Sequence, residues 1–265
     1  MRIAVIGAGR LASCVAPALQ KGGAEVCQVW SRTQASAAEL AGCLGCEAVW
    51  GGVSDIMRDA DIYLLCVKDD AIADIARQLH AVISPKAAII HTSGSVAMAV
   101  LARTGHGSCG VLWPMQTFTK GRSIDFSEVH LFVEATNGAV LSMLRELALT
   151  LTDAAHIHRL TGDQRRRLHL AAVFASNFVN HCCALSEDIL KPMGMDFSVM
   201  RPLLSETVAK LDIMSPAEAQ TGPAVRWDEG VMESHRQLLA SQPRTRAVYD
   251  QLSMSIHLLA VGHDE

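Results

Sequence analysis

The sequence predicts an α/β protein in which a doubly wound parallel sheet is followed by an all-α C-terminal part. Three observations predict it. Short apolar strand-like segments alternate with helical segments up to about residue 160. A glycine-rich turn follows the first of these strands, and beyond residue 160 helical periodicity continues without strand-like alternation. Alternating strands and helices of this length are typical of parallel sheets covered by helices.

The first part contains eight expected strands. Each is short and largely apolar, as in a strand buried in a parallel sheet. They lie at residues 2–6, 25–30, 48–50, 61–67, 87–91, 110–112, 131–134 and 155–158. The helices expected between them lie at residues 10–21, 34–44, 53–58, 71–82 and 139–151.

The second part consists of helices alone. Helical periodicity is sustained over residues 163–190 and returns at residues 198–210, 228–241 and 244–260. The sequence therefore predicts two domains, residues 1–160 with the sheet and residues 161–265 with the helices. No low-complexity linker lies between them, so we expect them to pack together.

Composition and charge exclude several classes of protein. The formal net charge is −4 and lysine and arginine form no long block, which argues against a nucleic-acid or anionic-membrane surface. No run approaches the ~18–20 consecutive apolar residues of a membrane span. The eight cysteines lie mostly in apolar stretches and no export signal precedes them. We therefore expect free thiols and a cytoplasmic location. We also expect no bound metal, because the Cys43–Cys46 pair has no second pair of ligands.

A dinucleotide-binding turn is expected directly after the first strand. The pattern G-x-G-x-x-A begins at Gly7 and opens the next helix. The first glycine permits a tight turn, the second lets the backbone approach a pyrophosphate, and the alanine allows close packing. The free N–H groups of the helix then bind the phosphates. The expected cofactor-binding residues of this turn are Gly7, Ala8, Gly9, Arg10 and Leu11.

The end of the second strand indicates which dinucleotide binds. An NAD site usually places a carboxylate there to accept from the ribose 2′-OH. This chain has Ser31, Arg32 and Thr33 instead. Arg32 can pair with a 2′-phosphate, and the two hydroxyls can donate to it. NADP is therefore expected in preference to NAD, the alternative being that Arg32 is only a surface cation.

Four further segments resemble a known family. They are HTSGS at residues 91–95, PMQTF at residues 114–118, HLAAVFASNFVNH at residues 169–181 and QTGPAVR at residues 220–226. Together they resemble a family of NADP oxidoreductases in which a Rossmann-like domain precedes a helical domain of unknown function. That family is similar in architecture to pyrroline-5-carboxylate reductase, ketopantoate reductase and 6-phosphogluconate dehydrogenase. The resemblance implies NADP, a helical domain like that of 6-phosphogluconate dehydrogenase and a homodimer formed through it, and leaves the substrate open.

The loops after the fourth and fifth strands are expected to face the nicotinamide, because ligands lie beyond the carboxyl ends of parallel strands. Val67, Lys68 and Thr92 are expected to bind the cofactor there. The expected substrate-binding residues of this edge are Ser93, Gly94, Ser95 and Gln116. For the two serines, capping of a following helix is an equally good explanation.

The helix that begins near residue 163 carries the expected catalytic groups. At α-helical spacing His169, Asn177 and Asn180 share one face of an otherwise apolar helix. His169 is expected to donate a proton to the group being reduced, since histidine titrates near neutrality, and Asn177 to orient the substrate. A histidine and two asparagines that only satisfy each other are the alternative. Similar reductases carry a lysine four residues before an asparagine on this helix, where this chain has Val173.

The remaining candidates lie in a polar loop and a basic run. Thr221 and Arg226 belong to a Gly-Pro loop, where Arg226 can clamp a substrate carboxylate or form a structural ion pair. The run of arginines at residues 165–167 is expected to be a solvated helix face.

The function that these residues predict is hydride transfer between NADP(H) and a small keto, imino or hydroxy acid bound between the domains. A non-catalytic NADP-binding sensor or assembly protein is the alternative, favoured by the missing lysine. A deazaflavin cofactor used alongside NADP is a further alternative.

Overall fold

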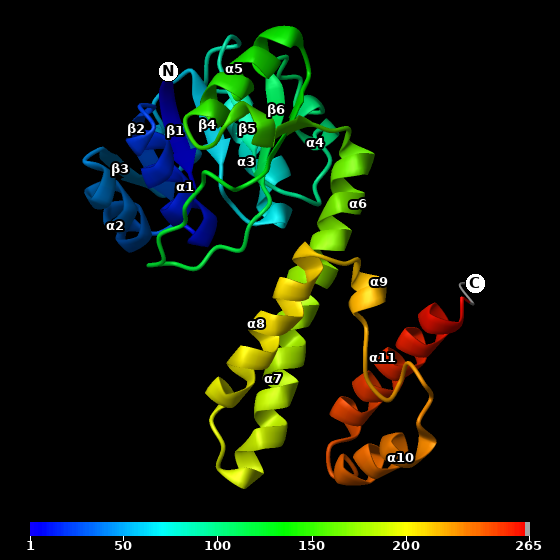
Figure 1. Cartoon of the computed structure of the whole chain (residues 1–265). Helices are drawn as coiled ribbons and strands as arrows, with labels where there is room; N and C mark the ends of the chain where they lie inside the picture. The colour runs from blue at the N-terminus through cyan, green and yellow to red at the C-terminus, as the bar shows by residue number, and fades with distance from the viewer. Residues whose placement is uncertain (263–265) are drawn as a thin grey trace. The chain divides into compact units, whose positions relative to one another are not determined.

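The computed structural model describes residues 1–262 (Figure 1). They form two compact units, Met1–Asn177 and the chain from Phe178 onward. Each unit is described by itself.

An eight-stranded sheet forms the centre of the first unit, with strand order β3-β2-β1-β4-β5-β6-β7-β8. The strands are β1 Arg2–Ile6, β2 Glu25–Ser31, β3 Glu47–Trp50, β4 Ile62–Leu65, β5 Ala88–His91, β6 Cys109–Pro114, β7 Leu131–Ala135 and β8 Ile157–Arg159. All neighbours pair in parallel except β6 and β7, which are antiparallel. The order reverses between β1 and β4, and a crevice for ligands forms at such a point.

Helices cover both faces of this sheet (Figure 1). They are α1 Arg10–Lys21, α2 Gln34–Leu44, α3 Ile72–His80, α4 Ala99–Ala102, α5 Gly138–Leu149 and α6 Gly162–Ala172, with short 3₁₀ turns at Val53–Asp55, Asp69–Ala71 and Ala154–His156. The helix expected at residues 53–58 is wrong, since only the 3₁₀ turn forms there.

The alternation of side chains along β1 explains the two cores. Ile3 and Val5 belong to the core packed by α1, α2 and α5, whereas Ala4 and Ile6 belong to the core packed by α3 and α4. Successive side chains of a strand point to opposite faces, so a strand covered on both faces is apolar throughout. The predicted fold class, a doubly wound Rossmann-like sheet followed by helices, is confirmed.

Helix α6 begins a long helical run that leads into the second unit. After α6 the winding changes to a π-helix at Val173–Phe178 and returns to α-helix in α7, Val179–Leu190. Strands end at Arg159, but the first unit extends to Asn177 because α6 packs against the sheet. The predicted boundary near residue 160 therefore coincides with the end of the last strand. The boundary between the two compact units lies later, after Asn177.

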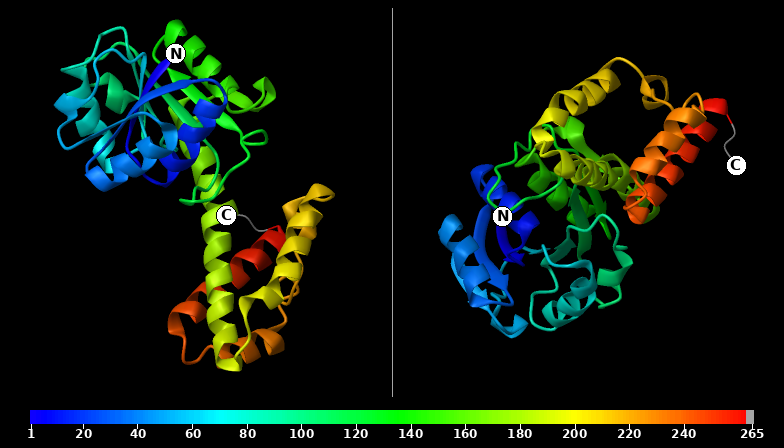
Figure 2. Two further views of the ribbon diagram at one scale, coloured as in Figure 1. Left: turned by 90° about the vertical axis from the view of Figure 1, so that its left-hand side faces the viewer. Right: turned by 90° about the horizontal axis from the view of Figure 1, so that it is seen from below.

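The second unit is entirely helical within the described residues. After α7 it contains α8 Arg201–Ala209, α9 Pro216–Ala219, α10 Glu229–Leu238 and α11 Pro243–Val261, with 3₁₀ turns at Lys191–Met193, Phe197–Met200 and Lys210–Asp212. Helices α10 and α11, orange to red in Figure 2, are joined by an ion pair of 2.8 Å between Arg236 Nε and Asp250 Oδ1.

The helical run Gly162–Met193 is long and apolar enough to span a membrane by length and composition, and none of its most apolar window is buried in the structure. No such segment was expected from the sequence, because no run of consecutive apolar residues is long enough. An exposed apolar helix is equally typical of a protein–protein contact, so this criterion alone is weak evidence for a membrane span.

Candidate cofactor and active site

The glycine-rich turn has the geometry that a pyrophosphate site requires. Gly7 has a φ of +112°, and a Cβ there would lie 2.5 Å from the carbonyl oxygen of Cys66. Its N–H donates to the carbonyl oxygen of Trp30 at 2.7 Å. Gly9 is the N-cap of α1 and offers no side chain to block the N–H groups of the first turn. Only glycine fits the first position, and the helix N-terminus beside it suits a phosphate.

The adenosine end of the predicted site lies where β2 meets α2. Ser31 ends β2, and Thr33 is the N-cap of α2, with its hydroxyl donating to Ser36 Oγ at 2.9 Å. Arg32 between them is exposed, and in residues 1–262 no carboxylate forms an ion pair with it. Its charge is therefore available to an anion such as a 2′-phosphate.

The loops after β4 and β5 are held together. The Thr92 hydroxyl donates to the carbonyl oxygen of Leu65 at 3.0 Å, which ties the end of β5 to the end of β4. The Ser95 hydroxyl donates to a carboxylate oxygen of Asp69, which follows Lys68. Both loops therefore lie at one edge of the sheet, as predicted for neighbouring parallel strands.

Ser93 organises the chain that follows β5. Its hydroxyl accepts from the backbone N–H groups of Ser95 at 3.1 Å and Val96 at 3.0 Å. Helix α4 begins only at Ala99, so this is a local turn rather than a helix cap.

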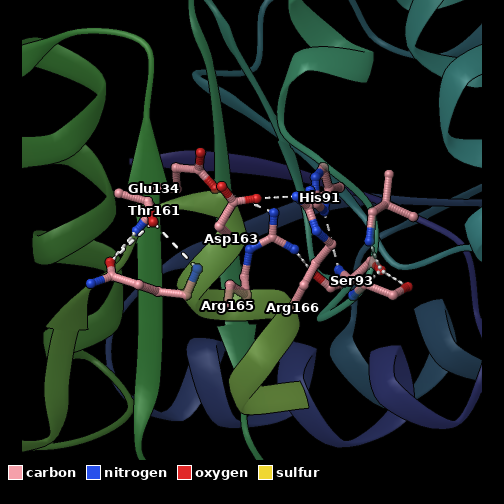
Figure 3. A network of polar contacts seen from close by, with 10 residues as sticks. His91, Ser93, Glu134, Thr161, Asp163, Arg165 and Arg166 are labelled. Carbon is pink, nitrogen blue, oxygen red and sulfur yellow. Dashed lines mark hydrogen bonds and ion pairs between the residues drawn. The ribbon is translucent and has the colours of Figure 1, made fainter. Parts of the chain in front are cut away.

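Arg165 is the main departure from the sequence predictions. Only 1% of its side chain is exposed, whereas Arg166 and Arg167 are exposed as expected. Its Nη1 donates to the carbonyl oxygen of Ser93 at 2.7 Å, and its Nη2 to Glu134 Oε2 at 3.2 Å (Figure 3). The expectation of a solvated face is wrong for this residue, because α6 packs against the sheet along the side that carries it.

His169 lies one turn after Arg165 and contacts the same loop. A Cβ on Gly94 would lie 2.5 Å from His169 Cδ2 and 2.8 Å from Trp113 Cε2. The ring centroids of His169 and Trp113 are 5.8 Å apart. The half-buried imidazole of His169 therefore lies against the backbone of the loop after β5, at the carboxyl edge of the sheet.

His91 is a buried polar residue that the sequence analysis singled out only as part of a motif. Its Nδ1 accepts from the Ser93 N–H at 3.2 Å, and its Nε2 has no partner in the described structure. Burial, and next the charge of Arg165, lowers the pKa of His91 to about 3. The ring is therefore neutral at physiological pH and acts as a fixed acceptor beneath the loop.

Asn177, Asn180 and Gln116 are exposed, and their role in binding a substrate stays a prediction. Asn177 lies within the π-helix Val173–Phe178 and Asn180 follows it in α7, so the α-helical spacing on which a face shared with His169 was expected is interrupted. Gln116 is exposed after β6, where its Oε1 accepts from the Thr117 N–H at 2.8 Å.

Thr221 and Arg226 lie in the second unit, in the segment between α9 and α10. Arg226 is exposed, and the Thr221 carbonyl oxygen accepts from Gln220 Nε2 at 2.9 Å. Their role in binding a substrate stays a prediction.

Two known domain families match this chain. The model for the domain described as "NADP oxidoreductase coenzyme F420-dependent" matches residues 2–95, and that for a domain of unknown function, DUF2520, matches residues 129–256. No curated protein is similar enough to this chain to match it.

Several solved structures are similar over almost the whole chain. A candidate NADP oxidoreductase from Bacteroides fragilis is 40% identical, with a TM-score of 0.91 and 97% of each chain covered. A protein from Thermotoga maritima is 21% identical, with a TM-score of 0.79, 98% of this chain covered and 99% of the other. An imine reductase from Myxococcus stipitatus in complex with NADP⁺ is 18% identical, with a TM-score of 0.68, 99% of this chain covered and 96% of the other. The last two, being distant in sequence, bear on the fold alone.

The fold, the glycine-rich turn and these comparisons define a Rossmann-type NADP-dependent oxidoreductase. The chain belongs to the NADP oxidoreductase family of the Bacteroides fragilis protein, in which a DUF2520 domain follows the dinucleotide-binding domain. The predicted family and the predicted cofactor, NADP, are confirmed.

Proposed function

We propose that this protein reduces a small keto or imino acid, or oxidises the corresponding hydroxy or amino compound, at the carboxyl edge of the first unit's sheet. The proposal is supported by one observation, the contact between His169 and Gly94, in which an imidazole lies against the loop expected to face the nicotinamide. Bound NADPH supplies the hydride that reduces the carbon of the C=O or C=N group.

The chain's own residues would position the substrate and move the proton. The backbone around Gly94 offers hydrogen bonds to a carbonyl or carboxylate group. The Ser95 hydroxyl, which donates to Asp69, can accept a hydrogen bond from a hydroxyl or amino group of the substrate. His169 donates a proton to the oxygen or nitrogen of the reduced group, so that one hydride and one proton are added in total. Asn177 and Asn180 are proposed to orient the substrate, with Gln116, Thr221 and Arg226 as further contacts.

A His169→Ala variant tests the proposal. Oxidation of NADPH is followed with small keto acids and imines, and reduction of NADP⁺ with hydroxy acids. We expect the variant to lower kcat by about 10²–10⁴-fold, the usual contribution of a general acid, with the NADPH affinity changed less than about two-fold. Arg167→Ala, an exposed change on the same helix, is the matched control. Equal kcat in His169→Ala and the control would remove His169 from the mechanism.

Two alternatives are tested by the same screen. The description of the N-terminal family model as coenzyme F420-dependent favours a deazaflavin as the partner of NADP(H). Turnover with an added deazaflavin, and none with the small acids, would favour it. Tight NADPH binding without turnover of any compound would favour a non-catalytic sensor.

A homodimer formed through the second unit is also proposed. Large apolar side chains are exposed there, among them Leu203 at 64%, Val208 at 65% and Leu238 at 77%. Apolar exposure on this scale is typical of a subunit contact. The cytoplasm is proposed as the location, because all eight cysteines, each within the described residues, are free thiols.

A further inference from the structure

A cavity of about 610 Å³ opens on the first unit beside β7 and β8. Its cationic or titratable lining consists of His130, His158 and Arg159, and its apolar lining includes Met115, Phe132 and Leu168. No carboxylate is among the described residues that line it. The cavity is therefore lined by basic and apolar side chains together.

The register of the sheet explains why the aromatic and imidazole rings share one face. Phe132 of β7 lies opposite His158 of β8, and their rings stack with centroids 5.2 Å apart. On its other side Phe132 lies opposite Trp113 of β6, at a centroid distance of 5.3 Å. Side chains directly opposite each other in a sheet point to the same face. A continuous row of rings thus leads from His169, through Trp113, to the cavity.

Two imidazoles in the cavity form a pair. His130 Nδ1 and His158 Nε2 are 2.8 Å apart, so one nitrogen carries a hydrogen that the other accepts. The ring of His156 lies edge-on to His130 at a centroid distance of 4.8 Å. In residues 1–262 no three His, Cys, Asp or Glu side chains are placed to hold a metal ion, so these rings do not surround a common ligand point.

The surroundings of His130 disfavour its protonation. Burial lowers the pKa of His130, and the nearby His156 and His158 lower it further, whereas Glu128 opposes them. Arg159, the last residue of β8, also lines the cavity, and it is exposed and makes no ion pair in the described chain. An anion placed between Arg159 and the imidazoles would reverse this balance and favour the protonated pair.

We propose that this cavity binds an organic anion, namely a carboxylate attached to an aromatic or similarly flat apolar group. Arg159, His130 and His158 would hold the carboxylate, and the ring would pack against Phe132, Met115 and Leu168. The proposal goes beyond the oxidoreductase activity, because binding here needs neither the cofactor nor turnover.

Calorimetry with benzoate on the full chain tests the site. At about pH 5.5 we expect benzoate to bind about ten-fold more tightly than at about pH 7.5, since histidine titrates between them. Benzyl alcohol, which has the ring without the charge, should not bind detectably. Arg159→Gln changes an exposed side chain and should weaken benzoate binding about ten-fold at both pH values, the usual effect of losing one charged contact. His158→Gln should remove the pH dependence.

The matched control is His80→Gln, which removes one ring of the chain's other imidazole pair, 3.3 Å from His106. It should leave benzoate binding and its pH dependence unchanged. Benzoate that fails to bind the wild type at either pH, or that binds Arg159→Gln and His158→Gln as it binds the wild type, would overturn the proposal. Affinity for NADPH, measured in parallel, shows whether each variant is folded. If the protein did not bind NADPH, the proposed function would be wrong, whereas the benzoate result would still test this cavity.

Discussion

Gly94 leaves less room than a methyl group between the loop after β5 and the two rings that lie against it. A Cβ there would meet His169 and Trp113 at 2.5 and 2.8 Å. We expect Gly94→Ala to lower the free energy of unfolding by about 1–3 kcal/mol, because the rings must move to admit the methyl group. Urea denaturation measures it.

Gly107→Ala is the control for that substitution, because an added Cβ there would meet no atom within 4 Å. Its free energy of unfolding should match that of the wild type or rise by a few tenths of a kcal/mol. If both variants were equally stable, the contact of Gly94 with His169 would not be as close as the structure has it.

Buried polar residues around the same loop fix its position. Arg165 is held by Ser93 and Glu134, and His91 is neutral because burial lowers its pKa to about 3. Protonation of His91 is unfavourable in the folded protein, whereas in the unfolded chain His91 is protonated at the ordinary pKa of histidine. Its contribution to stability is therefore present above its ordinary pKa and falls as the pH drops towards 3.

The turn between β2 and α2 carries the expected selection of NADP over NAD. We expect Arg32→Glu to weaken NADPH binding by about 10–100-fold, because a carboxylate repels the 2′-phosphate, while NADH binding stays equal or improves. Fluorescence titration with the reduced cofactors measures both affinities. Arg103→Glu, the same change at another exposed arginine of the first unit, should alter neither. Equal losses for both cofactors would mean that Arg32 does not contact the 2′-phosphate.

Local sequence predicts the elements of this fold better than it predicts their contacts. The turn at Gly7 and the apolar strands depend on neighbouring residues, so the pattern identifies them. The burial of Arg165 depends on Ser93, 72 positions away, and on Glu134, 31 positions away. The run of arginines at residues 165–167 contains no local sign of which one faces the sheet.

The winding of the helix that carries His169 is also not predictable from its local sequence. The spacing of Asn177 and Asn180 predicts one face with His169 only if the helix keeps 3.6 residues per turn. A π-helix at Val173–Phe178 changes that spacing. Nothing in the apolar sequence there distinguishes π from α winding, although π segments often occur at functional sites.

At the scale of the whole molecule, the proposed dimer explains why so many large apolar side chains of the helical unit are exposed in the single chain, since a partner subunit would cover them. The mass of one chain is 28.5 kDa. Light scattering should give about twice the chain mass for the wild type at micromolar concentration. Changing both Leu203 and Val208 to Glu should reduce it to 28.5 kDa, because two charges buried in an apolar contact have no partner. Leu149→Glu, at a residue 53% exposed in the first unit, should remain dimeric. A wild-type mass of 28.5 kDa would contradict the dimer, and a doubly substituted protein that stays dimeric would place the contact elsewhere.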